Sequence, residues 1–164
     1  MTQEMPKDEL GKRAEAFASA KAAFLDALNG TRDVDRLLML VGEYGYTEED
    51  ISIAALRRVL ALDPKHLRAL TAKGHMAFML GDNVEAYACY RRAEGIAPDD
   101  KEVLELKALL SLDWNDKIAT YRHILDLYPD EELARDNLQR LEALSEEDRK
   151  RVPLAWPPGQ HPPE

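Results

Sequence analysis

The sequence predicts an all-α protein built from antiparallel helix pairs that stack on one another. The segment from Leu67 to Pro98 reads as two amphipathic helices joined by a short turn and closed by a proline. The same layout precedes this segment at a spacing of 34 residues, since Pro64 corresponds to Pro98 and Arg57 corresponds to Arg91. A helix-turn-helix unit that recurs at this period is typical of a stacked-helix array rather than of a globule with one core.

The composition is that of a soluble helical protein with an excess of acidic residues. The 31 Asp and Glu residues outnumber the 22 Lys and Arg residues, which gives a net charge of −9. Such a chain is repelled by nucleic acid and by anionic membrane surfaces. The single cysteine, Cys89, cannot form an internal disulfide. No apolar stretch approaches the ~20 residues of a membrane span or matches a signal peptide, so a cytoplasmic protein is expected.

Residues 1–30 are predicted to form an N-terminal capping helix. Asn29 and Gly30 provide the expected stop at its C-terminal end. The helix does not match the repeat pattern, so we expect it to cover the edge of the first helix pair, with dimerisation through the same face as the alternative. Its apolar positions recur at spacings of three, four and seven, as a buried face requires: Leu10, Ala14, Phe17, Phe24, Leu25 and Leu28.

Residues 31–130 are predicted to form three helix pairs. In the first pair, the helix that closes at Pro64 fits the repeat better than the helix before it. The central pair, residues 67–98, is complete. The spacing from Pro98 to Pro129 is only 31 residues, so the third pair has lost about one helical turn, either from its first helix or from the corner at Trp114. We expect Trp114 to fill that corner, the alternative being an exposed indole for a partner.

The C-terminal part of the chain divides into a helix and a tail. Residues 131–151 place leucines on one side and charge on the other, so they are predicted to form a C-terminal capping helix. Residues 152–164 hold five of the nine prolines and cannot continue a helix. This proline-rich tail is expected either to be free or to dock through the apolar residues around Trp156.

The central pair resembles the tetratricopeptide repeat family. Gly74 stands where two packed helices need a residue without a side chain, and Ala86 and Ala93 occupy the small positions of the second helix. Tyr90 takes the aromatic position and Pro98 the closing one. The resemblance implies a right-handed α-solenoid whose first helices line a concave groove. It also implies that the protein holds another protein or peptide.

By the same resemblance, the groove-facing positions lie on the first helices of the central and the shortened pairs. Each set is spaced three and four residues apart and therefore shares one helix face. Apolar members suit an apolar side chain of the partner and acidic members suit a basic flank, although base rates of burial favour Phe78 and Leu109 as core between repeats. The predicted peptide-binding residues are Arg68, Thr71, His75, Phe78, Met79, Glu102, Glu105, Leu109 and Leu112.

The sequence offers no pattern for catalysis. The four histidines do not stand at a helical ligand spacing, and there is no cysteine pair, phosphate-binding glycine loop or nucleophile elbow. We therefore predict a protein that is not an enzyme and that has no cofactor and no metal site. The pair Glu102 and Glu105 is more typical of a solvated helix face than of a general acid and base.

The predicted function is a protein-protein interaction scaffold or adaptor that binds a partner peptide, with no nucleic-acid or membrane partner. The alternative is a structural subunit, for example a homodimer, that assembles through repeat edges, the N-terminal helix or the proline-rich tail. One branch of the family grips C-terminal carboxylates with Lys and Asn, but this chain has Thr71 and His75 in the central pair, which argues against that role. A chaperone similar to those of type III secretion is a more remote alternative, based on size, acidity and repeat number alone.

Overall fold

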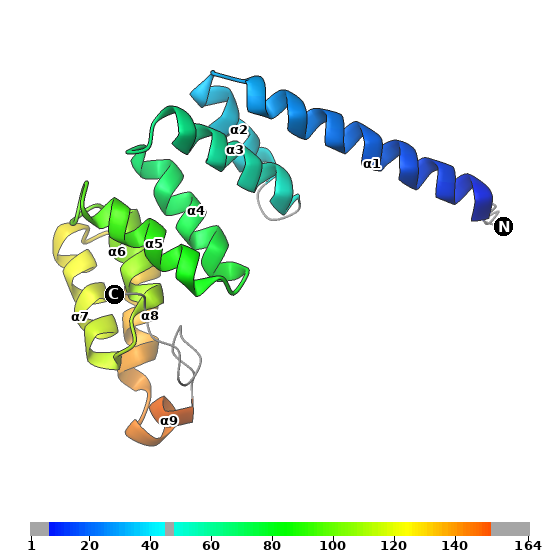
Figure 1. Ribbon diagram of the computed structural model, residues 1–164. Coiled ribbons are helices and arrows are strands. Elements are labelled where there is room, and N and C mark those ends of the chain that lie inside the picture. Colours follow the sequence, from blue (N-terminus) through cyan, green and yellow to red (C-terminus); the bar gives the residue numbers. More distant parts are fainter. Residues whose placement is uncertain (1–6, 45–47, 152–164) are drawn as a thin grey trace. The chain divides into compact units, whose positions relative to one another are not determined.

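α-Helix is the regular secondary structure of the described part of the chain, and short turns connect the helices. The computed structural model describes residues 7–44 and 48–151, which form nine α-helices and no strand (Figure 1). The predicted all-α fold is confirmed. The chain divides into two compact units, one ending at Pro64 and the other beginning at Lys65, and each unit is described by itself. The predicted proline-rich tail, residues 152–164, lies outside the described residues.

The first unit contains a long helix and one helix pair. Helix α1 spans Lys7–Gly30, and the pair consists of α2, Val34–Tyr44, and α3, Glu49–Leu62. Helices α2 and α3 pack against each other along their length. Their shared core is aliphatic and almost free of solvent, as expected for two amphipathic helices that bury their apolar faces. Its main members are Leu37, Leu40, Ala55, Leu56 and Val59.

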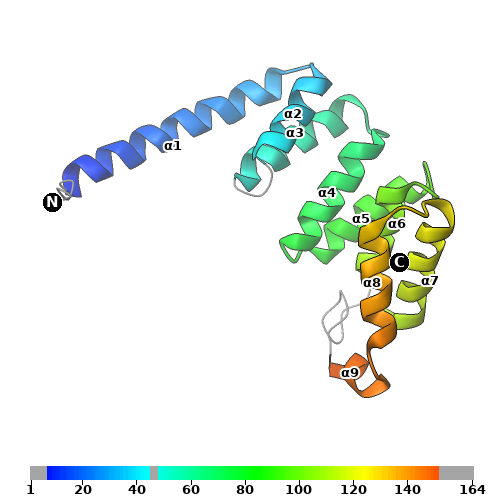
Figure 2. The same cartoon turned by 180° about the vertical axis from the view of Figure 1, so that it is seen from behind.

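Only the C-terminal half of α1 is packed against the pair. Leu28 is buried, the ring of Phe24 meets the ring of Tyr44 edge-on, and Arg58 Nε donates a hydrogen bond to the Thr31 carbonyl at 2.8 Å. The predicted buried face does not extend further, because Phe17 is 62% exposed. Both views of the ribbon show α1 running on beyond α2 and α3 (Figure 2).

The second unit contains two helix pairs and two further helices. The pairs are α4, Leu67–Met79, with α5, Asn83–Glu94, and α6, Lys101–Leu110, with α7, Trp114–Leu127. Helix α6 packs against both α4 and α5, so the pairs stack. Helix α8, Glu132–Ala143, lies against α7, and the short α9 spans Glu146–Arg151 (Figure 2). One core cluster joins α6, α7 and α8 through Leu104, Ala108, Tyr121, Ile124 and Ala134.

Aspartates begin three of these helices. The carboxylates of Asp82, Asp100 and Asp113 each accept hydrogen bonds from backbone N–H groups in the first turn of α5, α6 and α7. These bonds satisfy donors that the helix itself leaves unpaired and place negative charge at the positive end of the helix dipole. Gly81 precedes Asp82 with a φ of 79°, a conformation that glycine adopts without strain. The α4–α5 turn is therefore specified locally.

The shortened third pair lost its residues from the helix and not from the corner. Helix α6 has 10 residues where α4 has 13. The connection that follows each of them has the same length, 80–82 after α4 and 111–113 after α6. Trp114, the first residue of α7, is half-buried in that corner. None of the helices in the described part of the chain is long and apolar enough to cross a membrane.

Candidate functional site

The predicted binding residues come from α4 and α6, which lie side by side and run in the same direction. Thr71 contacts Glu102 near the start of each helix, and Gly74 faces Leu106 one turn later. We call the surface formed by the predicted residues the α4–α6 face. On α4, Arg68 and Met79 are exposed, whereas His75 and Phe78 are half-buried. On and after α6, Leu112 is exposed, whereas Glu102, Glu105 and Leu109 are half-buried.

Gly74 allows the two helices to come this close. A Cβ atom at this position would lie 2.4 Å from Leu106 Cδ2 and 3.2 Å from Cys89 Cβ. The first distance is too short for any real pair of carbon atoms, so only glycine fits while Leu106 stays in place. The predicted role of Gly74 as a residue of close helix approach is confirmed.

Thr71 is a correction to the predicted set, because its side chain is 0% exposed and offers no surface to a ligand. Its hydroxyl donates to Glu102 Oε2 at 2.6 Å and also lies 3.2 Å from the carbonyl oxygen of Arg68. A hydroxyl that is satisfied in this way can be buried at little cost. Thr71 therefore holds the Glu102 carboxylate in place on the α4–α6 face.

His75 contributes a neutral imidazole to the same surface. Burial lowers the pKa of His75, while the negative charge of Glu102 and a hydrogen bond to the backbone of Thr71 act in the opposite direction with smaller effect. Since the ordinary pKa of a histidine is already below 7, the ring is uncharged at neutral pH. It can accept or donate a hydrogen bond and adds no positive charge to the face.

Acidic groups gather at the N-terminal end of the face. Burial raises the pKa of Glu105, Lys101 acts to lower it, and the charges of Glu131, Glu102 and Asp100 raise it further. Lys101 Nζ lies 2.8 Å from Glu131 Oε2, so the one ammonium in this group already has a partner. Several carboxylates that repel one another are stabilised by an additional cation. The N-terminal end of the face can therefore receive a basic group.

Apolar groups gather at the opposite end. Met79, the last residue of α4, is 66% exposed, and Leu112, two residues beyond α6, is 41% exposed. Phe78 and Leu109 lie half-buried beneath this end. Because α4 and α6 run in the same direction, both C-terminal ends lie on the same side of the acidic group. The α4–α6 face thus has an acidic end and an apolar end.

Two members of the acidic end were missing from the predicted set. Lys101 begins α6, and Glu131 directly precedes α8. The two residues lie 30 positions apart in the sequence, with α7 between them. Reading each helix separately therefore could not reveal this contact.

The described residues offer little for other chemistry. None of them form a group of His, Cys, Asp or Glu that could hold a metal ion. Burial raises the pKa of Cys89 to about 11, so its thiol is protonated at neutral pH and is a poor nucleophile. A separate shallow hollow of about 360 Å³ is lined by residues of α6 and α7, namely Leu104, Lys107, Asp116, Ala119, Thr120 and His123.

Comparisons with known proteins support the fold. No family model matches the chain. No curated protein matches it either. A solved structure of a mutant O-GlcNAc transferase from Thermobaculum terrenum superposes with a TM-score of 0.60 at 24% identity. The match covers 71% of this chain and 24% of the transferase, so the chain spans about a quarter of that protein's length. The likeness shows a helical-repeat fold.

Proposed function

We propose that the chain is a non-catalytic protein-interaction module that binds an extended or helical peptide segment of another protein on its α4–α6 face. The observation that carries the proposal is the division of this face into an acidic end around Glu105 and an apolar end around Met79 and Leu112. A peptide with one large apolar side chain and a basic flank complements both ends.

The energetics favour such a ligand. Met79 and Leu112 expose apolar area that a bound side chain would remove from water, and each large apolar side chain contributes roughly 1.5–3 kcal/mol when fully buried. A lysine or arginine near Glu105 would relieve the repulsion among the neighbouring carboxylates. The helical-repeat fold supports the same function, because stacked helix pairs present extended binding surfaces.

Selection from a library of displayed peptides tests the proposal with the intact chain as bait. We expect the selected peptides to be enriched in a large apolar residue next to Lys or Arg. Met79→Asp should weaken binding by placing a charge at the apolar end. Glu105→Lys should weaken it by reversing charge at the acidic end, and affinity should fall as salt is raised.

Matched controls lie on α7. Leu127→Asp replaces an exposed apolar side chain by a charge, as Met79→Asp does. Asp126→Lys reverses a charge, as Glu105→Lys does, and both controls lie at exposed positions outside the α4–α6 face. All four variants should keep the helical content of the wild type, as measured by far-UV circular dichroism. The proposal is wrong if no common peptide pattern emerges, or if the α7 variants weaken binding as much as the variants of the α4–α6 face.

A further inference from the structure

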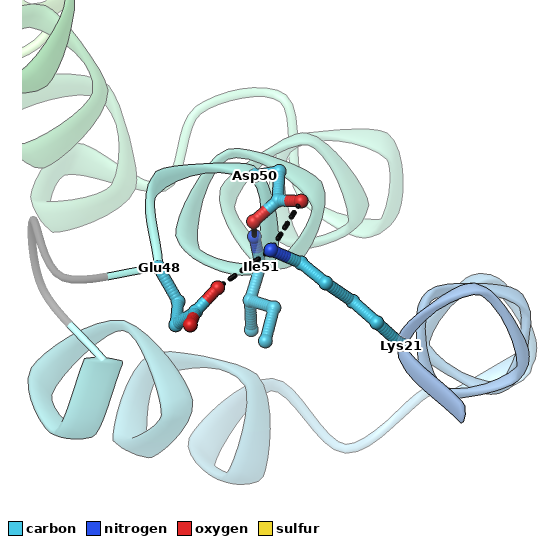
Figure 3. Close-up of polar contacts among 4 residues, drawn as sticks. All are labelled: Lys21, Glu48, Asp50 and Ile51. Atoms are coloured by element: carbon cyan, nitrogen blue, oxygen red, sulfur yellow. Dashed lines mark hydrogen bonds and ion pairs between the residues drawn. The ribbon is translucent and has the colours of Figure 1, made fainter. Parts of the chain in front are cut away.

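The N-terminal half of α1 projects beyond the helices that hold its C-terminal half. Lys21 Nζ lies 2.6 Å from Glu48 Oε2 and 2.9 Å from Asp50 Oδ2, and Figure 3 shows this ammonium between the two carboxylates. Glu48 and Asp50 mark the beginning of α3. Since Thr31, at the end of α1, meets Arg58, α1 and α3 run in the same direction. The residues of α1 before Lys21 therefore lie beyond the start of α3.

We call residues 7–20 the arm. At 1.5 Å per residue the arm is about 21 Å long. An isolated helix of this length is marginal in water, so most of its stability must come from packing. Yet Phe17 is 62% exposed, and Ala14 and Ala20 are exposed beside it. Among the described residues, the arm has an apolar side without a packed neighbour.

This apolar side continues an interface that already exists. Ala14, Phe17, Lys21, Phe24 and Leu28 follow one another at spacings that alternate between three and four residues, the pattern of a helix seam that packs on another helix. The lower part of the seam is occupied, since Phe24 meets Tyr44 and Leu28 is buried. In the upper part, Ala14 and Phe17 are exposed.

We propose that the arm is an interface with the arm of a second copy of this chain, in antiparallel orientation. The proposal is independent of peptide binding on the α4–α6 face. With Phe17 opposite Ala14 of the second copy, a large side chain meets a small one at both symmetric positions, as close packing of helices requires. Each exposed Phe17 then becomes buried.

An apolar hollow of about 180 Å³ lies beside the seam, between α1 and the α2–α3 corner. Because Phe17 lines this hollow, a second copy that packs on Phe17 lies next to it. The lining residues are Phe17, Ala20, Lys21, Phe24, Tyr44, Glu48 and Ile51.

Charge favours a second copy as the occupant. The whole chain carries a net charge of −9, so two copies repel each other over most of their surfaces. The arm is balanced, with three basic residues, Lys7, Lys12 and Arg13, and three acidic residues, Asp8, Glu9 and Glu15. A strongly charged partner would find no electrostatic attraction at a neutral surface, whereas two neutral arms approach each other without electrostatic repulsion.

The experiment measures mass by light scattering over a wide range of protein concentrations. The contact is short compared with stable interfaces, so we expect a weak dimer whose mass rises from 18.6 kDa toward twice that value. Phe17→Glu should keep the chain monomeric at every concentration. Ser19→Glu, an exposed change on the opposite side of α1, should leave dimerisation unchanged.

Spin labels on single introduced cysteines test the orientation. Cys89 is buried and stays unlabelled. In the antiparallel pair, labels at Ser19→Cys are separated by about 10 Å along the helix axis and labels at Asp26→Cys by about 30 Å. A parallel pair would make the two separations equal. The proposal is overturned by equal separations, by a monomer at all concentrations, or by association that survives Phe17→Glu.

Discussion

Replacing Gly74 by alanine is a direct test of how closely α4 and α6 approach. The added Cβ would stand 2.4 Å from Leu106 Cδ2 and 3.2 Å from Cys89 Cβ. Leu106 is completely buried, so its methyl group cannot swing into solvent. The Cys89 Cβ belongs to the rigid part of a helical residue in α5. Either the helices move apart or Leu106 leaves its rotamer.

Two opposing contributions decide the size of the effect. Alanine favours a helix over glycine by about 1 kcal/mol. Forcing a methyl group into a packed core costs roughly 1–3 kcal/mol, and the short distance to Leu106 places this site near the upper end. We therefore expect Gly74→Ala to lower the free energy of unfolding by about 1–2 kcal/mol. At a site without neighbours, the same change should be stabilising.

Urea unfolding followed by far-UV circular dichroism measures both cases. Gly42→Ala is the control, because a Cβ at this helical glycine of α2 meets nothing within 4 Å. Gly42→Ala should raise the free energy of unfolding by up to about 1 kcal/mol. The two glycines belong to different units, so the control reports on a site remote from Gly74 in the sequence.

A double-mutant cycle with Leu106→Ala isolates the contact itself. Leu106→Ala alone should cost roughly 2–5 kcal/mol through the cavity that it creates. In that background the clash with Leu106 is gone and the tight contact with Cys89 Cβ remains, so Gly74→Ala should be far less destabilising than in the wild type. If Gly74→Ala is neutral or stabilising in the wild-type background, or if the two changes are additive, the close approach of α4 and α6 is refuted.

Three further substitutions and one labelling experiment test the polar and titratable groups of the second unit. Thr71→Val removes the hydroxyl bond to Glu102 and should lower the free energy of unfolding in urea by about 1.5–3 kcal/mol, the usual range for a bond to a charged group. Burial lowers the pKa of His75 below 6.5, so the folded chain binds fewer protons than the unfolded chain and loses stability as the pH falls below 6.5. His75→Gln should reduce this loss of stability, as measured by urea unfolding at several pH values between neutral and mildly acidic. Because Cys89 is buried and its pKa is raised to about 11, a thiol reagent should label it only as the unit opens, at a rate that increases with urea. Burial lowers the pKa of Lys117, whose ammonium has no ion pair among the described residues. Lys117→Met should therefore raise the free energy of unfolding at neutral pH by up to about 1 kcal/mol, and the gain should shrink as the wild-type amine deprotonates at alkaline pH.

Local signals in the sequence were sufficient to predict the helices. Pro64 and Pro98 close helix pairs at a spacing of 34 residues, Gly81 permits the turn after α4, and Asp82 and Asp100 begin α5 and α6. Each of these signals acts through its own backbone or that of its close neighbours. A helix end is specified by such contacts, so it is readable from a short stretch of sequence.

The extent of burial along α1 was not predictable in the same way. Periodicity identifies the apolar face, and Phe17 and Phe24 both lie on it. Whether an apolar residue is covered depends on how far the neighbouring helix extends. Helix α3 begins beside Lys21, so Phe24 is half-buried whereas Phe17 is exposed. That limit arises from a contact between segments 27 residues apart, which no pattern within α1 records.

Thr71 shows the corresponding limit at the candidate site. Helical spacing places Thr71 on the same face as Arg68 and His75, which is correct for the backbone. Thr71 is nevertheless buried, and its hydroxyl donates a hydrogen bond to the Glu102 carboxylate on the adjacent helix. Thr71 thus fixes a carboxylate of the acidic end by a hydrogen bond and does not itself contact a ligand. Residue type alone could not distinguish these two roles.

The short length of α6 determines part of the surface of the candidate site. Because α6 ends three residues earlier than α4 does, Leu112 falls outside the helix and is exposed at the apolar end of the α4–α6 face. Lys117, in the first turn of α7, stands at the position where α5 has the fully buried Ala86, and burial lowers the pKa of this lysine. The shortened pair thus combines an exposed apolar group after α6 with a half-buried lysine in α7.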